Sequence, residues 1–309
     1  MREGAVRWLG VALGVAGLAA LAWYLVDALS TGAVALDRLS IVPLLGSFAL
    51  LAVGYAAQAT AWHALIRSQG TRLAWTEDAA RWAMSLLGKY LPGKVFHAVG
   101  RAFVYRREAD EAAVTAAFAA EFVLGMSAAS VASLIGLAIA PLALAPALRA
   151  ALWIGAALGL VATFAGVPDR LVAWLARRIL RRDVAPPARG LARIGAFALS
   201  LVGYLVMGAG LALLAASLAP VDASLWPTCV AAYCLSGIVS VLAFFVPAGL
   251  GVRDVALAGL LGLVMPAPVA ASVALAARCW LTAGDLAAVA LGYAVTRRAA
   301  RRGRDARGA

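Results

Sequence analysis

The chain has 309 residues, of which 64% are hydrophobic and only 14% are charged, and its mean hydropathy is +0.91. This balance excludes an ordinary soluble domain, in which about a quarter of the residues carry charge. The formal net charge of +12 does not indicate a nucleic-acid partner, because most lysines and arginines gather in four clusters. These clusters lie at residues 1–7, 67–107, 170–193 and 297–307. They fit cytoplasmic segments of a membrane protein whose two termini are both cytoplasmic.

Apolar runs of about 20 residues, the length that a helix needs to cross a bilayer, recur along the chain. Strands of a membrane barrel would be about ten residues long and would alternate in polarity, and the chain lacks that pattern. We therefore predict an all-α polytopic membrane protein with six full spans, at residues 6–26, 41–66, 112–139, 147–167, 193–218 and 268–296. The first run lacks a convincing cleavage site, so we interpret it as a retained span.

Two further apolar stretches, residues 75–107 and 226–265, are each interrupted near the middle by proline and glycine. We interpret them as broken or re-entrant helical hairpins; the alternative is a protein of eight spans. With hairpins, each half crosses the membrane three times, so the second half is inserted upside down. This order predicts an inverted repeat within a single transmembrane domain, as in many secondary transporters. Its parts are residues 1–139, residues 147–296 and a basic cytoplasmic tail, 297–309.

The two breaks should line a cavity, because unpaired backbone groups within a membrane are tolerated only next to protein or water. Their residues are Pro92 and Gly93 in the first break, and Pro247, Gly249 and Gly251 in the second. After the first break, Lys94, His97 and Arg101 follow the spacing i, i+3, i+7 and share one helical face. Together with a helix N-terminus they predict an anion site suited to a lipid phosphate. The alternative is that these cations extend to the cytoplasmic head groups.

Glu121, Arg278 and Asp285 lie well inside predicted spans, where a lone charge costs at least about 2.5–3.5 kcal/mol. Arg278, Thr282 and Asp285 form one polar stripe of a helix. Because Glu121 and Arg278 lie at similar distances after the two breaks, we predict that they pair across the repeat in an intramembrane polar track. The alternative pairs Arg278 with Asp285 and leaves Glu121 to neighbouring serines.

Arg253 and Asp254 directly follow the second break. They either close the anion site from its other end or cap a short helix over 252–264. Residues 170–182 alternate apolar and arginine side chains in a pattern typical of a helix lying on anionic cytoplasmic lipids. His63 ends a span beside a tryptophan, and we place it at the membrane interface. The chain lacks the motifs of an enzyme centre, a metal site or a nucleotide cofactor.

The stretches GKYLPGKVFHAVGR, EFVLGMSAAS and FFVPAGLGVRDVALAGLL resemble the lysylphosphatidylglycerol-synthase membrane-domain family. That family includes the flippase part of the bacterial multiple-peptide-resistance factor, and the resemblance covers nearly the whole chain. It implies a bacterial inner-membrane protein that moves a lipid with a polar head between leaflets. The working residues it implies are Lys89, Pro92, Gly93, Lys94, Arg101, Glu121, Pro247, Gly249, Gly251 and Arg253. The family usually has glutamate where this chain has Asp254, and the chain carries no aminoacyl-transferase domain for synthesis.

These features predict a flippase-like transporter, not an enzyme, for a phosphate-containing lipid. Candidate cargo is a polyprenyl-phosphate-linked sugar, a glycolipid or an anionic phospholipid. The alternative is a lipid-binding scaffold that holds a lipid-linked donor for a partner glycosyltransferase and moves nothing. Small-residue spacing at Ser127, Ser130 and Ser133 suits close helix packing, either within the chain or with a second copy of it.

Overall fold

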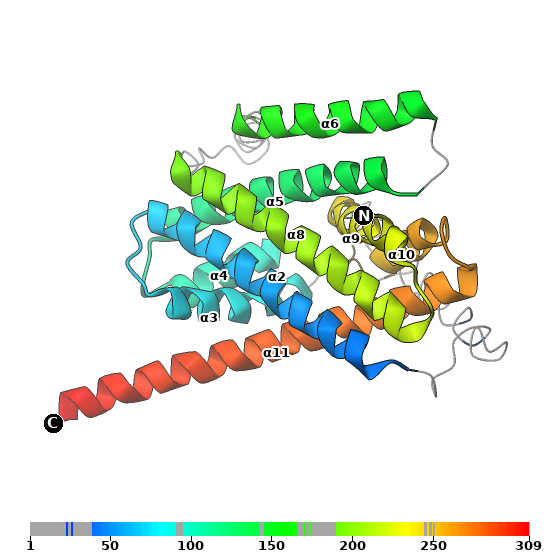
Figure 1. Cartoon of the computed structure of the whole chain (residues 1–309). Coiled ribbons are helices and arrows are strands. Elements are labelled where there is room, and N and C mark those ends of the chain that lie inside the picture. Colours follow the sequence, from blue (N-terminus) through cyan, green and yellow to red (C-terminus); the bar gives the residue numbers. More distant parts are fainter. Residues whose placement is uncertain are drawn as a thin grey trace, which may run out of the picture.

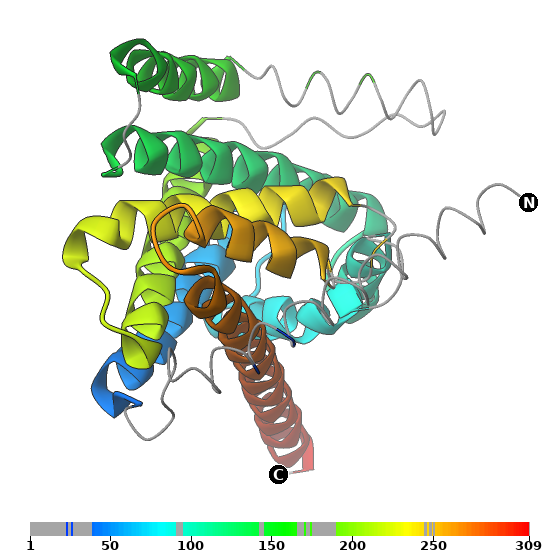
Figure 2. The same cartoon turned by 90° about the vertical axis from the view of Figure 1, so that its right-hand side faces the viewer.

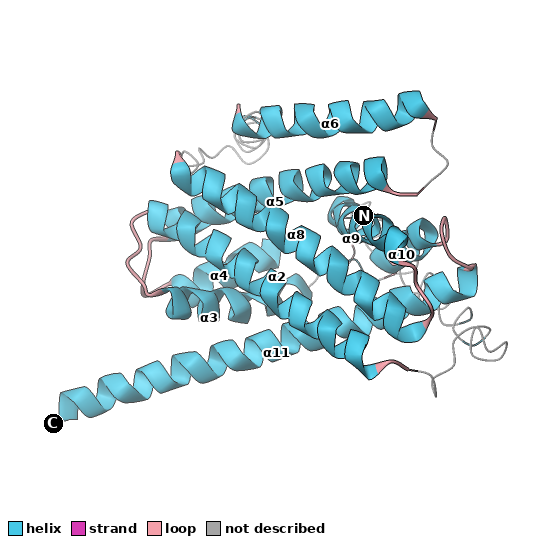
Figure 3. Ribbon diagram, viewed as in Figure 1, coloured by secondary structure: helices cyan, strands magenta, loops and turns pink. Residues whose placement is uncertain are grey.

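The computed structural model describes residues 23, 26, 39–90, 95–141, 145–165, 170, 174, 190–243, 246, 249 and 251–308. All regular secondary structure within these residues is helical, as predicted (Figure 3). Six helices there are long and apolar enough to cross a membrane, as is typical of a multi-pass membrane protein. They are α2 (Ile41–Ser68), α5 (Glu111–Ile139), α6 (Pro146–Phe164), α8 (Leu191–Leu218), the segment Ala223–Leu242, and Ala267–Arg298 of α11 (Ala267–Gly308).

Five of the six predicted spans agree with these helices to within a few residues, because hydrocarbon thickness dictates the length of an apolar run. The remaining predicted span, 6–26, lies outside the described residues except for Trp23 and Val26. Helix α11 continues without interruption to Gly308, so the basic tail predicted at 297–309 begins as a helical extension of the last span. Figure 1 shows this end of α11 projecting away from the other helices.

The first broken stretch contains two short helices, α3 (Trp75–Ser85) and α4 (Val95–Tyr105). Each has 11 residues, so each is about 16 Å long and too short to cross a hydrocarbon core of about 30 Å. A short 3₁₀ helix, η2 (Leu86–Tyr90), extends α3 toward the break. The break residues Pro92, Gly93 and Lys94 lie outside the described residues.

The second broken stretch is unequal. Helix α9 (Trp226–Leu242), preceded by the 3₁₀ turn η4 (Ala223–Leu225), is long enough to span, whereas α10 (Val252–Leu261) has only 10 residues. Between them Gly249 and Gly251 have φ angles of 64° and 74°, a backbone region that side chains disfavour, so glycine lets the chain reverse here. A Cβ on Gly249 would also lie 2.0 Å from Ser240 Oγ. Pro247 lies outside the described residues.

Helices α2 and α8 form the central pair of the bundle (Figure 1). A Cβ added to Gly54 of α2 would lie 3.2 Å from the carbonyl oxygen of Gly203, and one on Gly210 of α8 would lie 3.3 Å from that of Ser47. As α2 advances along its sequence, its contacts therefore move back along α8, so the two helices are antiparallel. The glycines allow the backbones to approach closely, as small residues do between membrane helices.

Two further helix–helix contacts resemble each other in their packing. Helix α5 packs on α9, and α11 packs on α3. In each contact a glycine of the long helix meets residues i and i+4 of its partner: Gly136 meets Pro227 and Ala231, and Gly292 meets Ala80 and Met84. Helix α6 lies outside α5, as both views show (Figures 1 and 2).

The buried apolar side chains form two clusters along the bundle. One joins parts of α8, α9, α10 and α11, and its largest fully buried member is Trp280. The other joins parts of α2, α3, α4 and α5 around Trp62 and Tyr105. The short helices α4 and α10 each pack one face into a different cluster, while Val99 and Phe103 of α4 and Val255 of α10 remain exposed.

Candidate functional site

Arg101 forms the first of three ion pairs of a lysine or arginine that lie in the interior of the described part of the chain. Its side chain on α4 is almost completely buried, and Nη1 lies 3.2 Å from Glu121 Oε2 on α5. Arg101 Nε donates to Ser85 Oγ at 2.7 Å, and the guanidinium lies 4.0 Å from the ring centre of Trp62. Glu121 also accepts a 2.8 Å hydrogen bond from the indole N–H of Trp82. The pair therefore ties the short helix α4 to the spanning helix α5.

Lys89 forms the second pair, at the end of η2. Its Nζ lies 2.6 Å from Oδ2 of Asp285 on α11. Asp285 is 1% exposed, whereas the Lys89 side chain is 34% exposed and can be reached from outside the bundle. The carboxylate of Asp285 also accepts hydrogen bonds from the hydroxyls of Tyr55, at 2.7 Å, and Tyr90. Thr282, one helical turn before Asp285, lies within hydrogen-bonding reach of Tyr90.

Arg278 and Asp254 form the third pair. Arg278 Nη2 donates to Asp254 Oδ2 at 2.7 Å, and Nε lies 3.1 Å from Oδ1, so the guanidinium binds the carboxylate through two nitrogens. Nη2 also donates to the carbonyl of Gly249 at 3.2 Å, and Asp254 accepts the backbone N–H of Gly251 at 3.0 Å. Asp254 thus caps α10, which is one of the two alternatives predicted for it, and also binds Arg278, a partner that was not predicted.

Arg253 lies beside an aromatic side chain in this interior. Its guanidinium lies 5.1 Å from the ring centre of Tyr233 and hydrogen-bonds the Tyr233 hydroxyl. Nε of Arg253 and Nε2 of His97 are both buried and have no hydrogen-bond partner among the described residues. Each therefore has a polar atom that a bound group could satisfy.

The three pairs and Arg253 lie within electrostatic range of one another. The charges of Arg253 and Arg278 repel the charged form of Lys89, and those of Arg101 and Lys89 repel the charged form of His97. These described residues comprise four cationic side chains, Lys89, Arg101, Arg253 and Arg278, and three carboxylates, Glu121, Asp254 and Asp285. With a neutral histidine the cluster carries an excess of one positive charge, which favours an anion. We call these seven residues the interior charge cluster.

The prediction that Glu121 pairs with Arg278 was wrong, because Glu121 pairs with Arg101 and Arg278 pairs with Asp254. The alternative partners were also wrong: Asp285 pairs with Lys89, and Glu121 accepts from Trp82. Spacing along one helix identifies which residues share a face, but it does not identify the helix opposite. Arg101 does not extend to the head groups, since it is buried and paired.

A second polar network in the first half was not predicted. Asp78 of α3 is fully buried and accepts from the hydroxyl of Tyr105 at 2.8 Å, while Nδ1 of His63 lies 2.6 Å from its other oxygen. The indole of Trp62 donates to Tyr105 at 2.8 Å. His63, predicted at the membrane interface, joins α2 to α3 through this contact with Asp78. The role of Asp78 was missed because it lies in the first turn of α3. An acidic residue at that position commonly interacts with the helix dipole and needs no other partner.

Comparison with protein-family models and with curated proteins finds no match to the chain. The resemblance inferred from the two Pro-Gly stretches therefore stays a prediction, and the function rests on the interior charge cluster and its surroundings.

Proposed function

We propose that the protein is a flippase-like transporter that moves a phosphate-containing lipid between the leaflets of the bacterial inner membrane. The single observation that carries this proposal is the interior charge cluster. Seven charged side chains lie where two short helices meet spanning helices, and Lys89 among them remains partly exposed. We expect the phosphate to bind at Lys89 and Arg253, while the lipid chains stay in the hydrocarbon.

The energetic cost of this cluster supports a functional role. Buried ion pairs contribute little to stability in comparison with packed apolar residues, because desolvation offsets their mutual attraction. Ionisable residues within membrane spans are expensive and commonly mark the path of a substrate. A bundle that needed only stability could fill these positions with apolar side chains.

The packing of the bundle supports the inverted repeat. Exchanging α2 with α8, α3 with α9, α4 with α10 and α5 with α11 turns each principal contact among these eight helices into another observed contact. The central helices α2 and α8 are antiparallel, as a two-fold axis in the membrane plane requires. Gly136 and Gly292 occupy matching contacts in the two halves.

The same exchange of helices relates the Arg101–Glu121 pair to the Asp254–Arg278 pair, with the positions of the positive and negative side chains reversed. In the first half the cation, Arg101, lies on the short helix and the anion, Glu121, on the long one. In the second half the anion, Asp254, lies on the short helix and the cation, Arg278, on the long one. The Lys89–Asp285 pair then joins the two halves, because Lys89 belongs to the first and Asp285 to the second. Breaking this pair is the step that would let the halves rock against each other.

In this proposal both termini are cytoplasmic, and the basic segments contact anionic lipids of that leaflet. The competing function is a scaffold that binds a lipid-linked donor for a glycosyltransferase, or for a second copy of the chain, without translocating it. Both functions use the same anion site, so lipid binding alone does not separate them.

The test is transbilayer movement of labelled lipids in liposomes that contain the purified protein. The panel contains phosphatidylglycerol, a polyprenyl-phosphate-linked sugar and phosphatidylcholine, and empty liposomes are the control. We expect one phosphate-lipid class to move at least about tenfold faster than in empty liposomes, a difference of roughly 1.4 kcal/mol in barrier. Retention of a phosphate lipid on the protein with no movement of any class would overturn transport in favour of the scaffold.

A further inference from the structure

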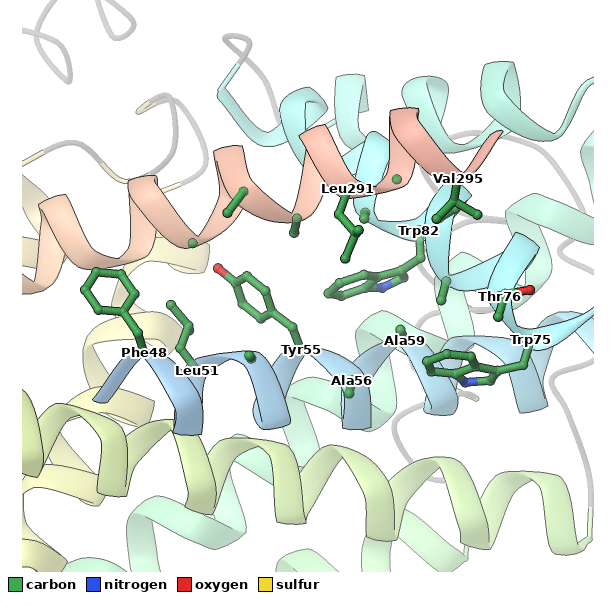
Figure 4. Close-up of a pocket in the computed structure, with 18 residues that line it drawn as sticks. Phe48, Leu51, Tyr55, Ala56, Ala59, Trp75, Thr76, Trp82, Leu291 and Val295 are labelled. Atoms are coloured by element: carbon green, nitrogen blue, oxygen red, sulfur yellow. The ribbon is translucent and has the colours of Figure 1, made fainter. Parts of the chain in front are cut away.

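A nearly apolar groove of about 480 Å³ lies between α2, α3 and α11, within the range of about 300–1,000 Å³ typical of ligand sites (Figure 4). Its walls are mostly alanine, leucine and aromatic side chains, and Gly284 and Gly292 leave space along α11. Ala56 on one wall, and Ala287 and Leu291 on the other, are exposed. Because α2 and the first part of α11 are long and apolar enough to span a membrane, we expect the groove to open toward hydrocarbon rather than water.

Two aromatic side chains separate this groove from the interior charge cluster. The rings of Tyr55 and Trp82 line the groove and meet edge to face, with centres 5.9 Å apart. Their polar atoms point out of it: the Tyr55 hydroxyl donates to Asp285 and the Trp82 indole donates to Glu121. Figure 4 shows both rings between α2 and α11, with the Tyr55 hydroxyl directed toward α11. Apolar space and ionic interior therefore lie on opposite sides of one pair of side chains.

This juxtaposition matches an amphipathic ligand with a hydrocarbon chain and an anionic head. A helix of a neighbouring protein would fill only the apolar groove. The excess positive charge of the interior charge cluster, on the other side of Tyr55 and Trp82, would then have no counter-ion. A lipid phosphate beside partly exposed Lys89 places its chain next to Tyr55, because Tyr55 and Lys89 bind the same carboxylate. Charge and shape thus select one occupant.

We propose that the groove between α2, α3 and α11 binds a hydrocarbon chain of the phosphate lipid, with Tyr55 and Trp82 forming the partition that the head group passes. This inference rests on the proposed function for the identity of the lipid. The two aromatic residues position the chain and hold Asp285 and Glu121 through their hydrogen bonds. Neither was identified from the sequence as part of a site.

The test is photocrosslinking of the purified full chain with phosphatidylglycerol that carries a diazirine in its acyl chain, followed by mass-spectrometric mapping. We expect labels to concentrate on groove-lining residues of α2, α3 and α11. Ala287→Trp and Ala56→Trp each place a ring into the open groove from opposite walls, and each should reduce this labelling about tenfold. The matched control is Ala157→Trp on α6, where the alanine is also exposed, and it should leave groove labelling unchanged.

Equal labelling of α6 and of the groove, or groove labelling that persists in both tryptophan variants, would overturn the proposal that the groove binds a hydrocarbon chain of the lipid. Crosslinks from the groove to a second protein copy would overturn it in favour of a protein occupant. Because labelling needs no translocation, the two proposals can fail separately. Groove labelling without lipid movement in liposomes removes the transporter and keeps the site, whereas movement without groove labelling removes the site and keeps the transporter.

Discussion

Replacing Lys89 by methionine should abolish most lipid movement and also destabilise the protein. The substitution leaves Asp285 buried at 1% exposure without its cation, although the two tyrosine hydroxyls still donate to it. Removing one partner of a buried pair typically costs 3–5 kcal/mol, and the remaining hydrogen bonds reduce this to about 2–3 kcal/mol. We expect lipid movement to fall by about tenfold or more, because the phosphate loses its reachable cation.

The double variant Lys89→Met with Asp285→Asn separates the structural effect from the functional one. The amide oxygen still accepts from the Tyr55 hydroxyl and the amide NH2 donates to the Tyr90 oxygen, while the uncompensated charge is removed. The free energy of unfolding should therefore return to within about 1 kcal/mol of the original protein. Lipid movement should stay low. The measurements are denaturant unfolding in detergent and movement in liposomes. A double variant that moves lipid at the original rate would show that this pair is only structural.

Replacing Asp254 by alanine should produce the largest loss of stability of any single change in the second half. Asp254 is almost completely buried and accepts from two guanidinium nitrogens of Arg278 and from the N–H of Gly251. The variant loses the helix cap and leaves a largely buried guanidinium without its carboxylate. We expect the free energy of unfolding to fall by about 3–5 kcal/mol.

Denaturant unfolding in detergent, followed by circular dichroism, measures this loss. The matched control is Asp110→Ala, because Asp110 precedes α5 but is exposed and makes no side-chain capping bond. That change should shift the unfolding free energy by less than about 0.5 kcal/mol. If the two variants are equally stable, Asp254 does not hold α10 to α11 in the way the geometry indicates.

The spans could be predicted from the sequence because a single constraint, the thickness of the hydrocarbon, governs each of them. Helix α2 illustrates this: the prediction 41–66 differs from Ile41–Ser68 by two residues at one end. Helix α9 shows the limit of the approach. It was predicted as one arm of a hairpin, and its length and hydropathy also suit a complete span. Apolar length does not distinguish the two.

The residues of the site were predicted better than their partners. Glu121, Arg278 and Asp285 were identified because a charged side chain within a membrane span is costly unless it has a partner, and all three are paired. Which residues pair depends on how α4, α10 and η2 are placed in the bundle. These elements lie directly beside the two breaks, and no periodicity in the sequence predicts the path of the chain there. Tyr55 and Trp82 were not predicted to belong to the site, because aromatic residues in apolar helices are usually core residues. Their polar atoms were the available signal, since a buried tyrosine or tryptophan usually needs a hydrogen-bond partner.

The central claim is that a phosphate group passes through the interior charge cluster. The most direct test takes the labelled phosphate lipid that moves fastest in the panel and a labelled lipid with the same hydrocarbon chains but no phosphate. It compares the initial rates at which liposomes containing the protein move the two. The comparison is repeated with Arg253→Met, since Arg253 belongs to the interior charge cluster and its Nε is buried without a hydrogen-bond partner among the described residues. We expect the original protein to favour the phosphate lipid about tenfold, and the variant to lose most of that preference. Equal rates for the two lipids in the original protein, or a preference that Arg253→Met leaves intact, would contradict the account.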